Sequence, residues 1–163
     1  MFEFSCFWPN DYEHGRDFVS DLDGFLGKLP KSWPYAIEMR NKHWLQKEYF
    51  DCLAKHRVTH VFNSWDAMPP VSEQMALSGS LTNANLIAAR FLLTPGRKYE
   101  DAVKTFQPYD NVQEENPDAR AAGAALIAEG KKAGAGRETF IYVNNRLEGN
   151  ALETISSMTL ADS

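Results

Sequence analysis

The chain has 163 residues, a formal net charge of −5, 44% hydrophobic residues and 24% charged residues. This length is typical of one domain, residues 1–163, with a buried core, and the composition is ordinary for a soluble globular protein. No run approaches the roughly 18 apolar residues of a membrane helix, and no charged-then-apolar leader opens the chain. We therefore expect a cytoplasmic protein with no membrane partner. The negative charge argues against non-specific nucleic-acid binding, in which Lys and Arg neutralise phosphates.

The pattern of the first half of the chain predicts strands over residues 2–7, 35–40 and 58–65. Between them, apolar residues at helical spacing predict helices over residues 18–29 and 46–56, and a short helix at about 72–77. In the second half, strands are expected over 86–94 and 140–144. Helices are expected from the stripe at 99, 103 and 106, over 119–132 with Asn116 as cap and Pro117 at its first position, and over 151–160.

Strands and helices thus alternate through about five strand–helix units, which calls for parallel strands joined by crossover helices. A doubly wound open sheet usually carries a Gly-rich turn after a strand, and Pro95-Gly96-Arg97 is too short for a phosphate-binding loop. Three of the strands place polar residues opposite an apolar face: Glu38 and Arg40, Arg90, and Asn144. Polar residues that face an inner lumen favour a partial TIM-like (β/α) barrel, although a complete barrel needs eight strands.

Two cysteines, Cys6 and Cys52, stand far apart and do not form a Cys-x-x-Cys pair. We expect both to be buried free thiols rather than a disulfide. No set of His, Cys, Asp and Glu has metal-ligand spacing by itself, so the sequence predicts no metal site and leaves the cofactor unknown. A metal held by one ligand from each of several strands would leave no motif.

Five segments resemble the YecE-like family, also called domain of unknown function seventy-two: residues 35–44, 62–69, 95–99, 106–110 and 144–151. The most specific pieces are the Glu-x-Arg strand at Glu38 and the closing stretch Asn-Asn-Arg-x-Glu-Gly-Asn-Ala at 144–151. The resemblance implies a (β/α) barrel of unestablished activity. It also implies that this chain corresponds to the fourth to eighth barrel units, without the opening Gly-Thr-Ser-Gly-Trp type strand. A shortened reading frame, one part of a split gene or an expressed fragment would each explain that.

Glu38 and Arg40 are two apart on one strand and therefore project from the same face. They form either a substrate clamp, with Glu38 as base and Arg40 for a phosphate or carboxylate, or a buried structural ion pair. Arg90 points toward the same lumen. Because two arginines would then outnumber one carboxylate, an anionic ligand is favoured.

Further candidates follow the strands, at the barrel face where catalytic residues gather. Asp66 is a candidate acid beside Asn63, and Trp65 could stack on a ring or serve packing alone. The remaining ligand-binding candidates are His43, Asn144, Asn145 and Arg146, of which the last three could equally be turn and cap residues. His56 and His60 are expected to be structural.

The leading functional hypothesis is a barrel that binds a phosphorylated or carboxylated small ligand, with hydrolase- or isomerase-type chemistry. The alternative is a non-catalytic barrel portion whose exposed sheet edges associate with another copy or with a separately encoded N-terminal part. Nucleic-acid processing, suggested only by analogy with endonuclease-type barrels, is disfavoured by the absence of a basic stripe.

Overall fold

The structure, a computed structural model, describes residues 1–160 and contains one five-stranded sheet with the strand order β1-β2-β3-β4-β5. All neighbouring strands are parallel. The strands are β1 (Phe2–Phe4), β2 (Ala36–Met39), β3 (Thr59–Ser64), β4 (Leu86–Phe91) and β5 (Glu138–Val143). Because β1 and β5 are the two edges, the sheet is open over the described residues and no closed barrel is formed.

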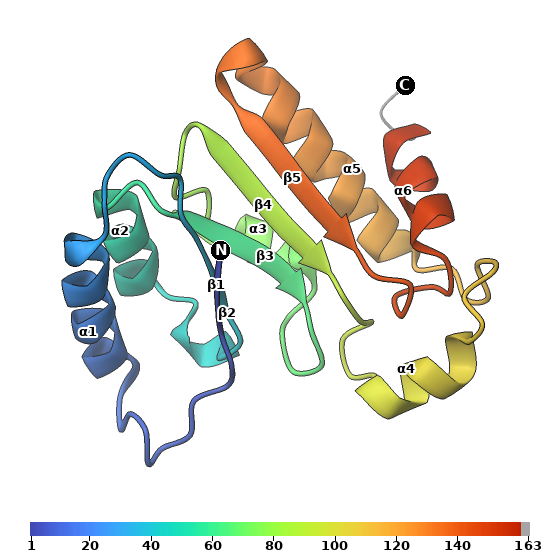
Figure 1. Cartoon of the computed structure of the whole chain (residues 1–163), viewed down its shortest axis with the longest axis horizontal. Helices are drawn as coiled ribbons and strands as arrows, with labels where there is room; N and C mark the ends of the chain where they lie inside the picture. The colour runs from blue at the N-terminus through green and yellow to red at the C-terminus, as the bar shows by residue number, and fades with distance from the viewer. Residues whose placement is uncertain (161–163) are drawn as a thin grey trace.

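Helices connect consecutive strands, as parallel pairing requires. The α-helices are α1 (Gly15–Lys28), α2 (Lys47–Lys55), α3 (Val71–Ala76), α4 (Tyr99–Phe106), α5 (Pro117–Lys132) and α6 (Ala151–Leu160). Two short 3₁₀ turns, η1 (Lys42–Trp44) and η2 (Gly134–Gly136), complete the set. Figure 1 shows α1 and α2 at one end of the sheet, and α5 and α6 beside β5 at the other. None of the helices within residues 1–160 has the length and apolarity needed to cross a bilayer.

The expected elements are present, with shifted boundaries. The first strand is shorter than predicted, because only Phe2–Phe4 pairs with β2. Beyond it, the side-chain amide of Asn41 takes the place of a strand partner: its Oδ1 accepts from the Phe7 N–H at 2.9 Å, and its Nδ2 donates to the Phe7 carbonyl at 2.9 Å. The stripe at 99–106 is a complete helix, and α5 begins at Pro117 with the Asn116 side chain accepting from the Ala119 N–H at 3.0 Å.

The core lies between one face of the sheet and the helices. Ile37 and Met39 of β2 pack with residues of α1 and α2. Phe62, Ile87 and Phe91 pack in a second cluster with residues of α5 and α6. Alternate residues of the strands therefore face the helices, fully buried in β2, β3 and β4 and partly buried in the edge strands, which is the alternation that the sequence predicted.

The opposite face of the sheet carries the remaining side chains, and we call it the open face. Its centre is a small apolar cluster of Ala36, Val61 and Ala88 that contains no helical residue. Strand register aligns its polar residues: Glu3 lies opposite Glu38, and Asn63, Arg90 and Tyr142 form one row across β3, β4 and β5. The open face therefore gathers the ionisable strand residues that the sequence singled out.

The expectation of two buried free thiols is half correct. Both cysteines are free, and Cys52 is buried, but Cys6 is exposed. The physical reason is the early end of β1, since Cys6 lies beyond the last paired residue and outside the core.

Candidate functional site

Glu38 is the centre of a charged cluster on the open face. It projects from β2, and its side chain is fully buried. Its Oε1 accepts from Arg40 Nε at 3.0 Å, and its Oε2 accepts from Arg90 Nη1. A carboxylate that has no contact with water needs such donors. Without them, burying its charge would cost several kcal/mol of folding free energy. Glu38 thus fixes the two guanidinium groups side by side.

Glu3 completes the cluster from the edge strand β1. Its Oε2 accepts from Arg90 Nη1 at 2.7 Å and lies 3.0 Å from Arg40 Nη2. Its side chain is 37% exposed, against 13% for Arg40 and 25% for Arg90. We call Glu3, Glu38, Arg40 and Arg90 the Glu–Arg cluster.

The Glu–Arg cluster contains two arginines and two carboxylates. Glu3 was not among the residues predicted from the sequence, so the prediction that two arginines would outnumber one carboxylate is wrong. Burial alone would lower the pKa of Arg90, but the hydrogen bonds and charges of Glu3 and Glu38 outweigh it and raise that pKa above its usual value. The sequence contained a sign of this role. Glu3 is a charged residue between two phenylalanines, so in an alternating strand it lies on the face opposite the apolar side chains.

Trp65 and Asn63 border the Glu–Arg cluster at the end of β3. The Arg40 guanidinium carbon lies 4.1 Å from the centre of a Trp65 ring, in a cation–π contact. Asn63 is fully buried and donates from Nδ2 to the Met39 carbonyl at 3.1 Å. Its Oδ1 accepts no hydrogen bond from the described residues. The cluster is therefore flanked by one aromatic ring and one unused buried acceptor.

Asp66, the predicted acid, is occupied by another contact. Its Oδ2 accepts from Lys98 Nζ at 2.6 Å, and its backbone carbonyl accepts from the Gly96 N–H at 2.7 Å. The hydrogen bond and charge of Asp66 raise the pKa of Lys98. These contacts tie the segment after β3 to the segment after β4. No interaction of Asp66 with the Glu–Arg cluster occurs among residues 1–160.

Asn144, Asn145 and Arg146 shape the turn between β5 and α6. Asn144 Oδ1 accepts from the Arg146 N–H at 3.0 Å, and Asn145 Oδ1 accepts from the Ala151 N–H at 2.8 Å, at the start of α6. The Arg146 guanidinium lies over the Tyr99 ring at 4.6 Å. Its Nε is buried and has no hydrogen-bond partner in the described part of the chain. The turn and cap alternative accounts for the two asparagines.

Glu148, in the same closing stretch, was not selected from the sequence but is the best-connected residue there. Its buried carboxylate lies 2.9 Å from Arg120 Nε, accepts from Thr154 Oγ1 at 2.6 Å, and also accepts from the Asn116 N–H. It thereby joins the start of α5 to the start of α6. Glu148 thus gives the closing stretch 144–151 a structural role, and the ligand-binding prediction for Asn144, Asn145 and Arg146 stays a prediction.

His43 does not belong to the Glu–Arg cluster either. It is exposed on η1, beside a surface hollow that Gly15, Trp44 and Tyr49 also line. A larger groove of about 530 Å³ lies between α5, α6 and β5, where Ile127, Ile141 and Met158 contribute to its walls. None of the residues lining it is part of the Glu–Arg cluster, so cavity size and charged chemistry point to different places. The convergent charged groups predicted from the sequence, Glu38, Arg40 and Arg90, lie in the Glu–Arg cluster and not in this groove.

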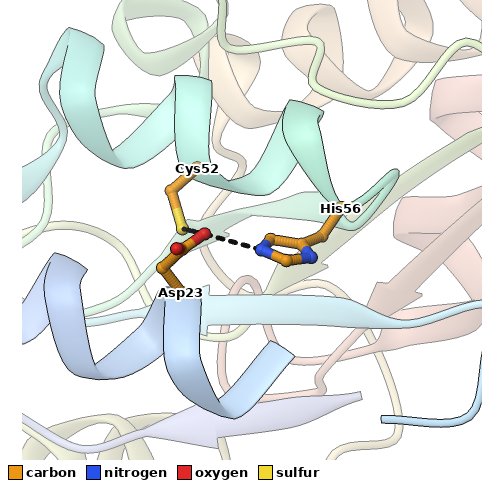
Figure 2. A group of neighbouring side chains, drawn as sticks. All are labelled: Asp23, Cys52 and His56. Atoms are coloured by element: carbon orange, nitrogen blue, oxygen red, sulfur yellow. Dashed lines mark hydrogen bonds and ion pairs between the residues drawn. The ribbon is translucent and has the colours of Figure 1, made fainter. Parts of the chain in front are cut away.

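A second polar group lies on the outer surface, between α1 and α2. Asp23, Cys52 and His56 place one potential metal-ligand atom each within 4.8 Å of one another (Figure 2). No metal-ligand spacing was predicted from the sequence, where Cys52 was expected to be a buried free thiol and His56 a structural residue. Their separation of four residues on one helix was the signal that could have paired them.

The sequence model of a family described as a protein of unknown function, DUF72, matches residues 4–161. A DUF72 family protein from Enterococcus faecalis has a similar structure, with a TM-score of 0.55 at 19% identity, over 97% of this chain and 56% of that chain. A DUF72 family protein from Thermotoga maritima gives a TM-score of 0.59 at 18% identity, over 99% of this chain and 54% of that chain. The chain therefore spans just over half the length of these relatives. None of the curated proteins is significantly similar to it in sequence.

Proposed function

The chain belongs to the DUF72 family, and from its parallel sheet and its Glu–Arg cluster we propose that it binds a small carboxylated or phosphorylated ligand at the strand ends of a partial (β/α) barrel. One observation carries the proposal. Two guanidinium groups are oriented by the buried Glu38 and are already bridged by a second, exposed carboxylate, that of Glu3.

Glu3 marks the position of the ligand. Its Oε2 accepts from Arg90 Nη1 and lies within ion-pair distance of Arg40 Nη2, which is a position that a ligand carboxylate or phosphate oxygen could take. Exposed ion pairs contribute only about 0.2–1 kcal/mol, so an anion with more acceptor oxygens can displace Glu3. Glu38 cannot be displaced in the same way, because solvent does not reach it.

Trp65 supplies a wall of the same site. Its ring holds the Arg40 guanidinium at 4.1 Å and limits the rotamers available to it. A fixed guanidinium loses less side-chain entropy when an anion binds. The contact with Trp65 therefore holds the Arg40 side chain in the conformation that would bind the ligand.

The proposal concerns binding rather than turnover. Hydrolase- or isomerase-type chemistry with Glu38 or Asp66 as base would need one of these carboxylates to be free. In the described structure Glu38 accepts from two arginines and Asp66 pairs with Lys98. We therefore assign Glu38 the role of positioning residue for Arg40 and Arg90.

Calorimetric titration with inorganic phosphate and, separately, with succinate tests the proposal and distinguishes the two anion classes. Arg90→Gln should weaken binding roughly tenfold or more, because a charge-assisted hydrogen bond is lost. Glu3→Gln should strengthen binding, because the internal competitor is removed. Glu73→Gln, at an exposed residue of α3, changes the net charge equally and serves as control. Equal affinities for the Glu3 and Glu73 variants would reject the proposal.

A second candidate function is association through the open sheet. Phe140 and Tyr142 stand on the open face of the edge strand β5 and are 46% and 53% exposed. Such an edge can pair with another chain, either a second copy or a complementing N-terminal part. Light scattering should then show a dimer of the isolated chain that Tyr142→Lys converts to a monomer. A wild-type monomer at all concentrations would count against association between copies.

A further inference from the structure

We propose that Asp23, Cys52 and His56 form a binding site for a zinc ion between α1 and α2, separate from the Glu–Arg cluster. Figure 2 shows the three side chains converging, Asp23 from α1, Cys52 from α2 and His56 from the residue that ends α2. Cys52 and His56 are one helical turn apart and project from the same side of the helix. The opposing helix provides the third ligand atom.

The three ligand atoms are close enough together to be brought around one small tetrahedral ion. Asp23 Oδ1 lies 2.6 Å from His56 Nε2 and 3.9 Å from Cys52 Sγ, and all three ligand atoms lie within 4.8 Å of one another. Ligand atoms around tetrahedral zinc are separated by roughly 3.3–3.6 Å, given bond lengths of about 2.0–2.3 Å. Small side-chain rotations that widen the first distance and narrow the second would therefore make room for the ion.

The donor set selects the metal class. One thiolate, one imidazole and one carboxylate suit Zn²⁺, whereas Mg²⁺ and Ca²⁺ prefer oxygen ligands alone. Three protein ligands leave a fourth position for water. The site lies at the surface, since the Asp23 side chain is 39% exposed, so an ion can enter without opening the core.

The backbone around the site is held in place. The His56 N–H donates to the Cys52 carbonyl at 3.4 Å and to the Leu53 carbonyl at 3.1 Å, which fixes the end of α2. Leu22 and Leu26 of α1 pack in the same core cluster as Leu53. Two of the ligands thus come from one rigid helix end and the third from a helix packed against it.

Lys55 competes with a metal ion for the carboxylate of Asp23. Its Nζ lies 2.7 Å from Asp23 Oδ1 and 2.9 Å from Oδ2. When Oδ1 binds the ion, Lys55 can retain Oδ2 and orient the carboxylate from outside the ligand set. Its positive charge still opposes a bound cation, so Lys55→Gln should tighten metal binding.

The surroundings of Cys52 fit a role as metal ligand better than a role as nucleophile. Burial, together with the nearby Asp23 charge, raises the pKa of its thiol to about 11. At neutral pH the group is therefore a thiol, and thiolates are the reactive form. A bound divalent ion would displace that proton to solvent, and the thiolate would become its ligand.

Titration of the metal-free full chain with Co²⁺ tests the proposal. The expected result is binding of one equivalent, with a thiolate-to-cobalt charge-transfer band and the intense visible bands of tetrahedral cobalt, both removed by Zn²⁺. Zn²⁺ should also raise the melting temperature, because it binds only the folded chain. Absence of the charge-transfer band at millimolar Co²⁺ would overturn the proposal.

Matched variants locate the site. Cys52→Ser should abolish the charge-transfer band, and His56→Gln should weaken cobalt binding at least tenfold. Cys6→Ser, which removes the exposed second thiol, should leave the spectrum unchanged. Circular dichroism of each metal-free variant establishes that it is folded. A band that survives in Cys52→Ser, or that disappears in Cys6→Ser, would place the metal elsewhere and overturn the assignment.

Discussion

Glu3 and Arg90, which are 87 positions apart in the chain, are joined by a 2.7 Å contact between Oε2 and Nη1 that spans β2 and β3. The contact links the edge strand to the fourth strand through the charges of the open face. Glu38 lies between them and bonds to the same arginine. The two carboxylates thus share a partner but differ in burial, and that difference has a measurable consequence.

Glu38→Gln should lower the free energy of unfolding by about 3 kcal/mol, because it leaves Arg40 and Arg90 short of their buried counter-charge. Glu3→Gln should cost less than about 1 kcal/mol, since its carboxylate is partly exposed. Urea unfolding of both variants measures the difference. Equal losses would show that burial does not set the strength of these pairs.

Glu148→Gln should destabilise the chain by about 3 kcal/mol. The change removes a buried charge that Arg120 and Thr154 contact, and it leaves the arginine without that partner. Glu138→Gln, at the exposed start of β5, should change stability by less than about 0.5 kcal/mol. Thermal unfolding of the pair tests this assignment. A small loss for the Glu148 variant would mean that the junction of α5 and α6 does not depend on the charge.

Gly149→Ala should destabilise the chain by at least about 1 kcal/mol. Gly149 has φ of 117°, and an added Cβ would lie 2.5 Å from the Asn111 carbonyl oxygen. Gly24→Ala is the opposite case, because Gly24 lies within α1 with no atom within 4 Å of an added Cβ. That variant should gain about 0.5–1 kcal/mol from helix propensity. Denaturant unfolding of both variants should therefore give shifts of opposite sign.

His60 should make stability depend on pH. Burial lowers the pKa of its imidazole from 6.5 to about 3, so the folded chain holds His60 neutral. Between those values the unfolded chain binds a proton at this residue that the folded chain does not. The free energy of unfolding therefore falls as pH falls through the window, by up to about 5 kcal/mol in total.

His60→Gln should remove this contribution, so its stability should decline less steeply than that of wild type between pH 6.5 and 4. His14→Gln, at an exposed histidine, should retain the wild-type slope. Urea midpoints measured across this range give both slopes. Identical slopes for wild type and His60→Gln would show that His60 titrates normally in the folded chain.

The faces of the strands could be predicted because apolar and polar side chains alternate along each strand with a period of two. Ile37 and Met39 face helices while Glu38 and Arg40 face the other side, as their spacing indicated. The length of β1 could not be predicted in this way, because its end depends on Asn41, which is 34 positions away from the Phe7 backbone that it binds. The sequence pattern near Phe7 gives no indication of a hydrogen-bond partner so far along the chain.

The face on which each strand residue lies was predictable from its spacing, whereas the pairing of particular residues across the sheet was predicted only in part. Glu38 and Arg40 were paired correctly from their spacing, and Arg90 was placed on their face. Glu3 was missed because its role appears only when β1 lies beside β2. Asp66 was placed at a strand end, but its pairing with Lys98 depends on the course of the following loop.

The contact between Trp65 and Arg40 gives the cluster an optical reporter. Trp8 and Trp33 are 69% exposed, and Trp44 stacks on Phe18 at 5.1 Å, so only Trp65 among the four tryptophans touches a guanidinium of the cluster. Any event that draws Arg40 away from the ring changes the electrostatic field on that indole. Intrinsic fluorescence of the unlabelled protein would therefore report a displacement of Arg40 from that ring.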